Sequence, residues 1–174
     1  MRKSYLRQVV NLVFFLILQV FIPPMLSLQG TCFMYIGFLL FLPWARHNMI
    51  WQLLLSFGIG LLVDIFYQGV GIHACAAVFL LYFRNLFLYF FIMERGKQGG
   101  MVTPTFTHLG AVKFGLYTFF FTVCYHVIAF ALDHQAIQLL FVYPSRFLLS
   151  IVVSNLTILL PSLVAAMLLR IYAQ

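Results

Sequence analysis

Long apolar runs separated by short polar links constrain this chain more than any other feature of its sequence. Ten Lys or Arg and three Asp or Glu residues are its only charged ones among 174, whereas soluble domains carry about 25% charged residues. A helix needs about 20 apolar residues to cross a membrane, and in hydrocarbon it satisfies its own backbone groups. The sequence therefore predicts an all-α, polytopic integral membrane protein with about six transmembrane helices in one bundle.

Six runs fit such helices. The predicted spans are residues 9–28, 31–44, 50–67, 72–93, 109–132 and 147–169. The first has the basic start of a signal peptide, but its length and the Pro23–Pro24 interruption favour an uncleaved anchor. The second has only 14 residues, so it either borrows residues 27–30 or makes a half-crossing.

The basic residues give the orientation. With six spans and a cytoplasmic N-terminus, seven basic residues lie inside and one outside, which agrees with the positive-inside rule. The inside residues are Arg2, Lys3, Arg7, Arg46, Arg95, Lys97 and Arg170, and the outside one is Arg146. Both termini are therefore predicted to be cytoplasmic. The net charge of +7 then reflects topology, and nucleic-acid binding is not expected.

Asp64 is the one acidic residue well inside a predicted span. An ionisable group there costs several kcal/mol unless it is neutral, paired or close to water, so Asp64 is a candidate site. It lies about 6 Å from the external end of its span by helical rise. The next span begins near His73, after a glycine turn that includes Gly71. We expect an Asp64–His73 contact, which serves as a structural pair, a partner site, or a ligand or proton site.

Arg84 and Lys113 are the basic residues within spans. Arg84 lies about 12 residues into the fourth span, so three environments are open to it. Its long side chain can snorkel toward the cytoplasm, bind the C-terminal carbonyls of a neighbouring helix, or bind a lipid headgroup. Lys113 is near the inner end of the fifth span and is expected to snorkel.

Small residues four positions apart indicate that the spans pack closely on one another. The pairs are Ser56 and Gly60, Ala111 and Gly115, and Ser150 and Ser154. Such spacing lets helix backbones approach in lipid, where packing drives association. Asp64 follows Gly60 by one turn and shares its face. The pattern predicts a bundle without saying whether the partner helix belongs to this chain or to another.

The sequence offers no arrangement suited to catalysis or to a metal or cofactor. Its three cysteines lie in apolar runs without metal-ligand spacing, and its histidines form no HExxH motif. Glu94 is predicted on the opposite side of the membrane from Asp64 and Asp133, so paired carboxylates are not expected. His126 and Asp133 remain candidate polar sites. Haem ligation by His126 is an open alternative to simple hydrogen bonding.

Several of these residues together resemble the rod shape-determining MreD family of small bacterial inner-membrane proteins. The stretches concerned are Gly58–Phe66, the Gly69–Gly71 turn, Ile72-His73-Ala74, Phe83-Arg84, His126, Asp133, and the residues Ser150, Ser154 and Thr157. The resemblance extends over nearly the whole chain.

The resemblance implies a non-enzymatic membrane scaffold of the bacterial cell-elongation machinery. Such a protein would bind an MreC-like transmembrane scaffold, contact membrane lipids, and link the cytoskeleton to peptidoglycan synthesis. The family is also similar in fold to the substrate-binding S components of energy-coupling-factor transporters. A second hypothesis is therefore a small-molecule-binding transport subunit, with an outward-open cavity lined by Asp64, His73 and Asp133.

Overall fold

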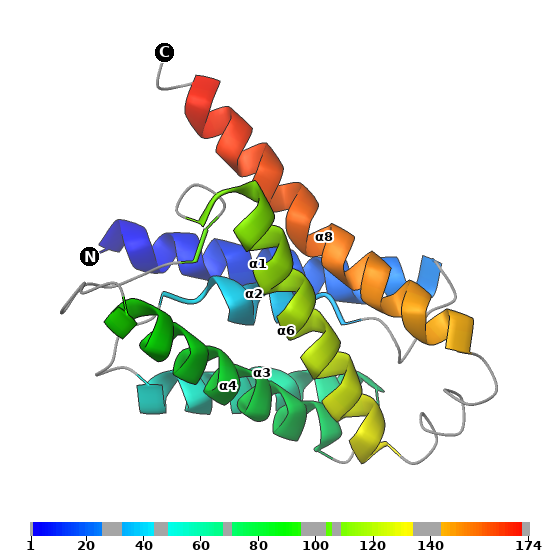
Figure 1. Cartoon of the computed structure of the whole chain (residues 1–174). Coiled ribbons are helices and arrows are strands. Elements are labelled where there is room, and N and C mark those ends of the chain that lie inside the picture. The colour runs from blue at the N-terminus through cyan, green and yellow to red at the C-terminus, as the bar shows by residue number, and fades with distance from the viewer. Residues whose placement is uncertain are drawn as a thin grey trace.

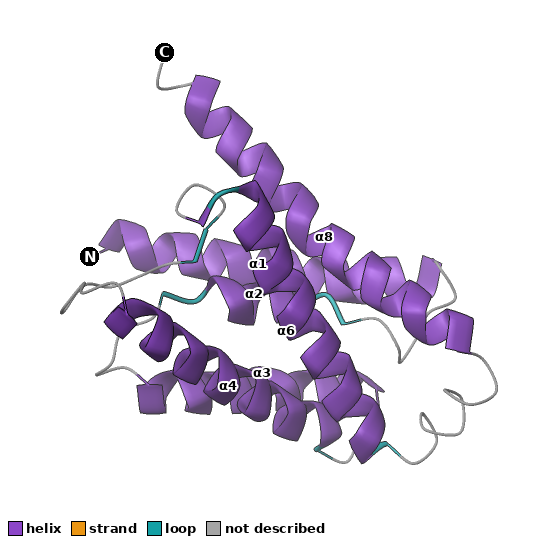
Figure 2. Cartoon of the chain, in the orientation of Figure 1, coloured by secondary structure: helices purple, strands orange, loops and turns teal. Residues whose placement is uncertain are grey.

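The computed structural model of the chain is a bundle of helices (Figure 1). It describes all residues except 1, 26–32, 44–48, 68–70, 95–103, 106–108, 134–143 and 172–174. The helices of the described part are α1 (Arg2–Met25), α2 (Ile36–Phe41), α3 (Met49–Tyr67), α4 (Ile72–Glu94), α6 (Ala111–Leu132) and α8 (Pro144–Ile171). Figure 2 shows helices and connecting segments, with no strand among the residues described. The all-α prediction is confirmed for these residues.

Three of the described helices are long and apolar enough to cross a membrane. They are Met49–Tyr67, Ile72–Phe90 and Ala111–Leu132, and shorter apolar helical stretches lie at Val9–Gln19 and Phe147–Leu163. Large apolar side chains are exposed along these helices, and Ile65 and Phe66 on α3 are 74% and 72% exposed. Such continuous apolar faces are typical of surfaces that contact lipid or other membrane proteins. These helices give the chain the makeup of a multi-pass membrane protein.

Helices α3 and α4 form a closely packed hairpin, and they lie side by side in Figure 1. Gly60 of α3 makes this approach possible. A Cβ atom at Gly60 would lie 2.7 Å from both the Ala74 nitrogen and the His73 carbonyl oxygen of α4. Where α4 begins, Gly71 has a φ of 81° and its carbonyl accepts a hydrogen bond from the Cys75 amide. A left-handed φ favours glycine, which explains the residue at this turn.

The short helix α2 lies in the interior of the bundle, where it contacts α1, α4 and α6 (cyan in Figure 1). Residues 33–40 are all buried. Phe15 of α1 packs over Gly37, where any Cβ would collide with its ring. Phe41, at the other end of α2, stacks between Phe15 and Phe114 with ring centroids 6.0 and 5.8 Å away. Side chains of other helices therefore surround α2.

The helical part of the predicted 31–44 span is shorter than a full crossing. Six helical residues rise about 9 Å, against a hydrocarbon core of about 30 Å. Phe33 contacts His73 at one end of this segment, and Arg84 binds its other end. His73 and Arg84 are separated by about 16 Å of helical rise along α4. Turn, bend and irregular residues at 33–35 and 42–43 make up the rest of the described segment. Such backbone is tolerated at membrane depth only where protein covers it.

The close approach at Gly60 gives a direct stability test. The Gly60→Ala substitution places a methyl group against the α4 backbone, so we expect a loss of about 1–3 kcal/mol. Gly58→Ala is the matched control on the same helix, because nothing lies within 4 Å of a Cβ there. It should be neutral or slightly stabilising. Thermal unfolding in detergent measures both, and equal effects would contradict the described packing.

Candidate functional site

Asp64 caps the start of helix α4. Its two carboxylate oxygens accept hydrogen bonds from the backbone amides of His73 (3.1 Å) and Ala74 (3.0 Å). These amides belong to the first turn of α4 and have no partner within the helix, and the positive end of the helix dipole favours a carboxylate there. Asp64 is only 3% exposed. The expected Asp64–His73 contact is thus present, but it uses the backbone of His73 rather than its imidazole.

The His73 imidazole joins a group of buried hydroxyls from α2 and α6. Its Nδ1 atom lies 3.1 Å from the Tyr125 hydroxyl, and that hydroxyl is hydrogen-bonded to the hydroxyl of Tyr35. The Tyr35 hydroxyl in turn donates to the His73 carbonyl oxygen at 3.5 Å. Both tyrosines are fully buried. The three residues form a closed ring of hydrogen bonds, which we call the His73–Tyr125–Tyr35 ring.

The start of the α2 segment is held by side chains of α1 and α8. The Gln19 side-chain oxygen accepts from the backbone amides of Met34 and Tyr35. The Phe33 amide donates to the Ser154 hydroxyl at 3.2 Å. Gln19 also donates to the Tyr67 hydroxyl at 2.9 Å, which ties this end to α3. Three amides that precede or begin α2 therefore find acceptors away from their own helix.

Arg84 binds the other end of α2. This residue is fully buried. Its Nη2 atom donates to the carbonyl oxygens of Leu40 (3.1 Å) and Leu42. These oxygens lie at the negative end of the α2 dipole and have no helical partner. Of the three environments considered from the sequence, binding to helix C-terminal carbonyls is the one observed. Snorkelling is wrong, because burial keeps the guanidinium away from solvent.

Further polar side chains fix the Arg84 guanidinium in place. Its Nε donates to the Tyr117 hydroxyl and its Nη1 to the Asn85 side-chain oxygen, both at 2.9 Å. Tyr117 itself donates to the Leu40 carbonyl at 3.2 Å. Asn85 donates to Gln52, which donates to the Pro43 carbonyl at 2.7 Å. No carboxylate of the described residues pairs with Arg84, so hydrogen bonds and the α2 dipole alone stabilise its charge.

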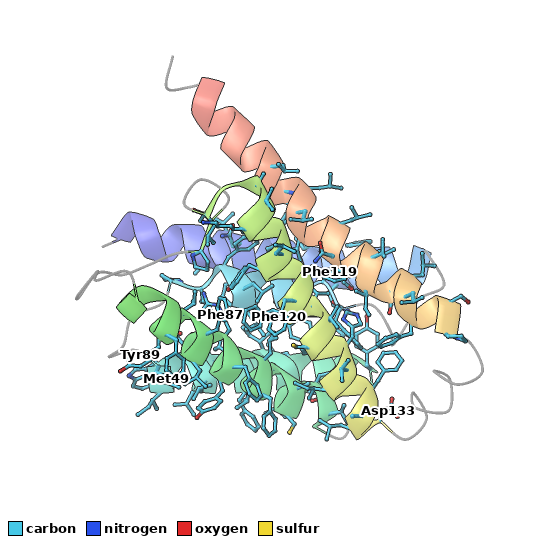
Figure 3. The ribbon with its side chains drawn as sticks, in the orientation of Figure 1. Met49, Phe87, Tyr89, Phe119, Phe120 and Asp133 are labelled. Carbon is cyan, nitrogen blue, oxygen red and sulfur yellow. The ribbon has the colours of Figure 1, made fainter. Side chains whose placement is uncertain are left out.

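His126 and Asp133 occupy different parts of α6. The Nδ1 atom of His126 lies 2.8 Å from the Thr122 carbonyl, and its Nε2 lies 3.5 Å from the Ser154 hydroxyl on α8. This arrangement agrees with the expected hydrogen-bonded histidine. Asp133 follows the last turn of α6, as Figure 3 shows, and its amide donates to the Ala129 carbonyl.

The described residues contain no group of three His, Cys, Asp or Glu side chains that could hold a metal ion. Two buried polar atoms in this part of the chain, Thr122 Oγ1 and Asn155 Nδ2, have no hydrogen-bond partner. The other polar contacts described above mostly join a side chain to a helix end. Chemically, this arrangement is suited to fixing helices against one another.

Sequence reasoning missed three of the residues that build this arrangement: Gln19, Tyr35 and Tyr125. Each lies within an apolar run, and Tyr125 directly precedes the candidate residue His126. A glutamine inside a predicted span is a weak polar signal that could have drawn attention to Gln19. The two tyrosines resemble the chain's other seven, and only the tertiary structure distinguishes them.

Comparison with known protein families, curated proteins and solved structures found no match for this chain.

Replacing Asp64 tests the capping role. Leucine removes both acceptors and leaves two buried amides unpaired, so Asp64→Leu should lower stability by about 2–4 kcal/mol. Asparagine keeps one acceptor, so Asp64→Asn should cost about 1–2 kcal/mol. Unfolding in detergent measures the difference. If both variants lost equal stability, the charge of Asp64 rather than its hydrogen bonds would be responsible.

Replacing Arg84 by lysine tests the guanidinium at the end of α2. Lysine keeps the charge but cannot donate to Tyr117, Asn85 and two carbonyls at once, because it lacks the planar fork. We expect Arg84→Lys to lower the free energy of unfolding by about 2–4 kcal/mol. Lys113→Met, at an exposed position, is the control and should change it by less than about 0.5 kcal/mol. A harmless Arg84→Lys would contradict the described role.

Proposed function

We propose that the chain is a non-enzymatic scaffold of the bacterial cell-elongation machinery in the inner (cytoplasmic) membrane. In this role it binds an MreC-like transmembrane protein by helix packing and helps to link the cytoskeleton to peptidoglycan synthesis. The chain crosses the membrane six times, with both termini in the cytoplasm. The resemblance of the 58–84 region to the MreD family supports this proposal.

The main support for this proposal is that the polar residues of that region hold the helices of the bundle together. Gly60 allows α3 to approach α4, Asp64 caps α4, and Arg84 binds the end of α2. The outward faces of the same helices carry large apolar side chains. A rigid interior with apolar outer faces suits a protein whose task is to bind other helices in the membrane.

The transport-subunit hypothesis receives less support from the same contacts. It requires Asp64, His73 and Asp133 to face a ligand in an outward-open cavity. Both carboxylate oxygens of Asp64 already accept backbone hydrogen bonds, and His73 contacts Tyr125 through Nδ1. A ligand at Asp64 would therefore have to uncap α4, which costs about 1–2 kcal/mol for a lost cap.

Depletion in a rod-shaped host tests the proposed function. Cells that lose the protein should round up, and expression of the wild-type chain or of Gly58→Ala should restore rods. In the same cells, the detergent-extracted protein should co-purify with the MreC-like scaffold. Rods that persist after depletion, together with no recovery of any shape or wall-synthesis component, would contradict the proposal.

A further inference from the structure

The His73–Tyr125–Tyr35 ring contains donors that can point in either direction. When the imidazole carries its proton on Nε2, Tyr125 donates to Nδ1 and Tyr35 donates to Tyr125. When Nδ1 carries a proton, Nδ1 donates to the Tyr125 oxygen and Tyr125 donates to Tyr35. Tyr35 then donates to the His73 carbonyl, which lies 3.5 Å from its hydroxyl. Tyr125 donates and accepts in both arrangements, whereas Tyr35, which has one proton, donates to Tyr125 in the first and to the His73 carbonyl in the second.

This reversal matters because an imidazolium has two N–H donors and no acceptor. When a buried imidazole takes up a proton, the new N–H donor usually faces an N–H group or a carbon atom, neither of which can accept a hydrogen bond. Here the proton enters at Nδ1, the two hydroxyls rotate, and the last donor reaches a backbone carbonyl. No heavy atom needs to move far, and no polar group on the Nδ1 side of the imidazole loses its hydrogen-bond partner.

Burial of the His73 imidazole, which is 8% exposed, opposes a proton on it, and the neighbouring carboxylates favour one. On α3, the Asp64 carboxylate bonds to the His73 amide, and the Tyr67 ring lies 6.0 Å from the imidazole. On α6, Tyr125 contacts Nδ1, and the charge of Asp133 acts on the ring. From the α2 segment come the Tyr35 hydroxyl and the apolar Phe33 ring, which is 4.7 Å away. Phe33 also contacts His126 and lies between the two histidines.

Among the residues that the structure describes, the charged groups that act on His73 are the carboxylates of Asp64 and Asp133. No basic side chain of the described residues forms an ion pair with Asp64, and the carboxylate is 3% exposed. A positive charge on the neighbouring imidazole offsets this buried negative charge. His73 is the second residue of α4 and is 8% exposed, so the imidazole lies at the end of this helix rather than in its middle.

We propose that His73 is a reversible proton-binding site in the folded bundle, with the Tyr125 and Tyr35 hydroxyls reversing direction as the proton is taken up from water. The step transfers one proton to the imidazole and breaks no other bond. It does not depend on the proposed scaffold function. Because Tyr35 begins α2 and Tyr125 lies in α6, the reversal links proton binding to the contact between these helices and α4.

Nitrogen NMR of the protein with ¹⁵N-labelled histidine, in lipid nanodiscs, tests this proposal. His73→Gln identifies the His73 signals by their loss. In the wild-type protein, these signals should move reversibly from neutral imidazole to imidazolium as the pH falls from about 8 to 4.5 while the bundle stays folded. His73 signals that stay those of a neutral ring over this range would overturn the proposal.

Two phenylalanine variants test the hydroxyl ring itself. Tyr125→Phe removes the acceptor for the charged Nδ1–H, so the proton affinity of His73 should fall about tenfold or more. Tyr35→Phe removes the next member and should lower the affinity about threefold. Tyr82→Phe is the control, because Tyr82 is an exposed tyrosine of α4 away from the ring, and it should change nothing. An unchanged affinity in Tyr125→Phe would overturn the proposal.

Discussion

The hydrogen bonds between Arg84 and the last carbonyls of α2 are the interaction on which the rest of the structure depends. A six-residue helix is too short to be stable alone, and inside a membrane its unpaired carbonyls have no water to bind. The Leu40 and Leu42 carbonyls receive donors from a buried guanidinium on α4. Without these donors, the buried Leu42 carbonyl would lose its hydrogen bond and the Leu40 carbonyl would keep only the one from Tyr117.

The amino-terminal end of α2 is also held by hydrogen bonds to side chains of other helices, and here the side chains are neutral. Gln19 of α1 and Ser154 of α8 accept from the amides at residues 33–35. Four long helices thus each contribute to α2, since Tyr117 of α6 joins Arg84 at the carboxyl end. Contacts with α2 therefore place helices that are distant in sequence relative to one another.

Much of the fold could be predicted from the sequence, because long apolar runs bounded by charges or glycines specify helices by themselves. The predicted spans 50–67 and 109–132 agree with α3 and α6 within two residues. The predicted 31–44 span differs, since tertiary contacts rather than length or periodicity decide where α2 begins and ends. A membrane segment that protein covers on every side does not need the run of about 20 apolar residues that a lipid-exposed spanning helix needs.

The residues of the candidate site that could be predicted from the sequence are those whose charges are costly to bury in a membrane. Asp64 and Arg84 stand out as charges in hydrocarbon, and glycine turns place His73 next to Asp64. The sequence left the role of each open, because the partners of both are backbone groups. Backbone amides and carbonyls occur at every residue, so no sequence pattern marks the ones that a charged side chain will bind. Tyr35 and Tyr125 carried no signal at all.

Hydrogen–deuterium exchange of the Ile36–Phe41 amides in lipid nanodiscs tests the central claim most directly. In the wild-type protein these amides should exchange slowly, as those of the long helices do. In Arg84→Leu, which removes the guanidinium donors and leaves Tyr117 as the donor to the Leu40 carbonyl, their exchange should accelerate about tenfold or more, while the centre of α3 stays protected. Equally slow exchange in Arg84→Leu would contradict the claim that this arginine keeps α2 in the interior.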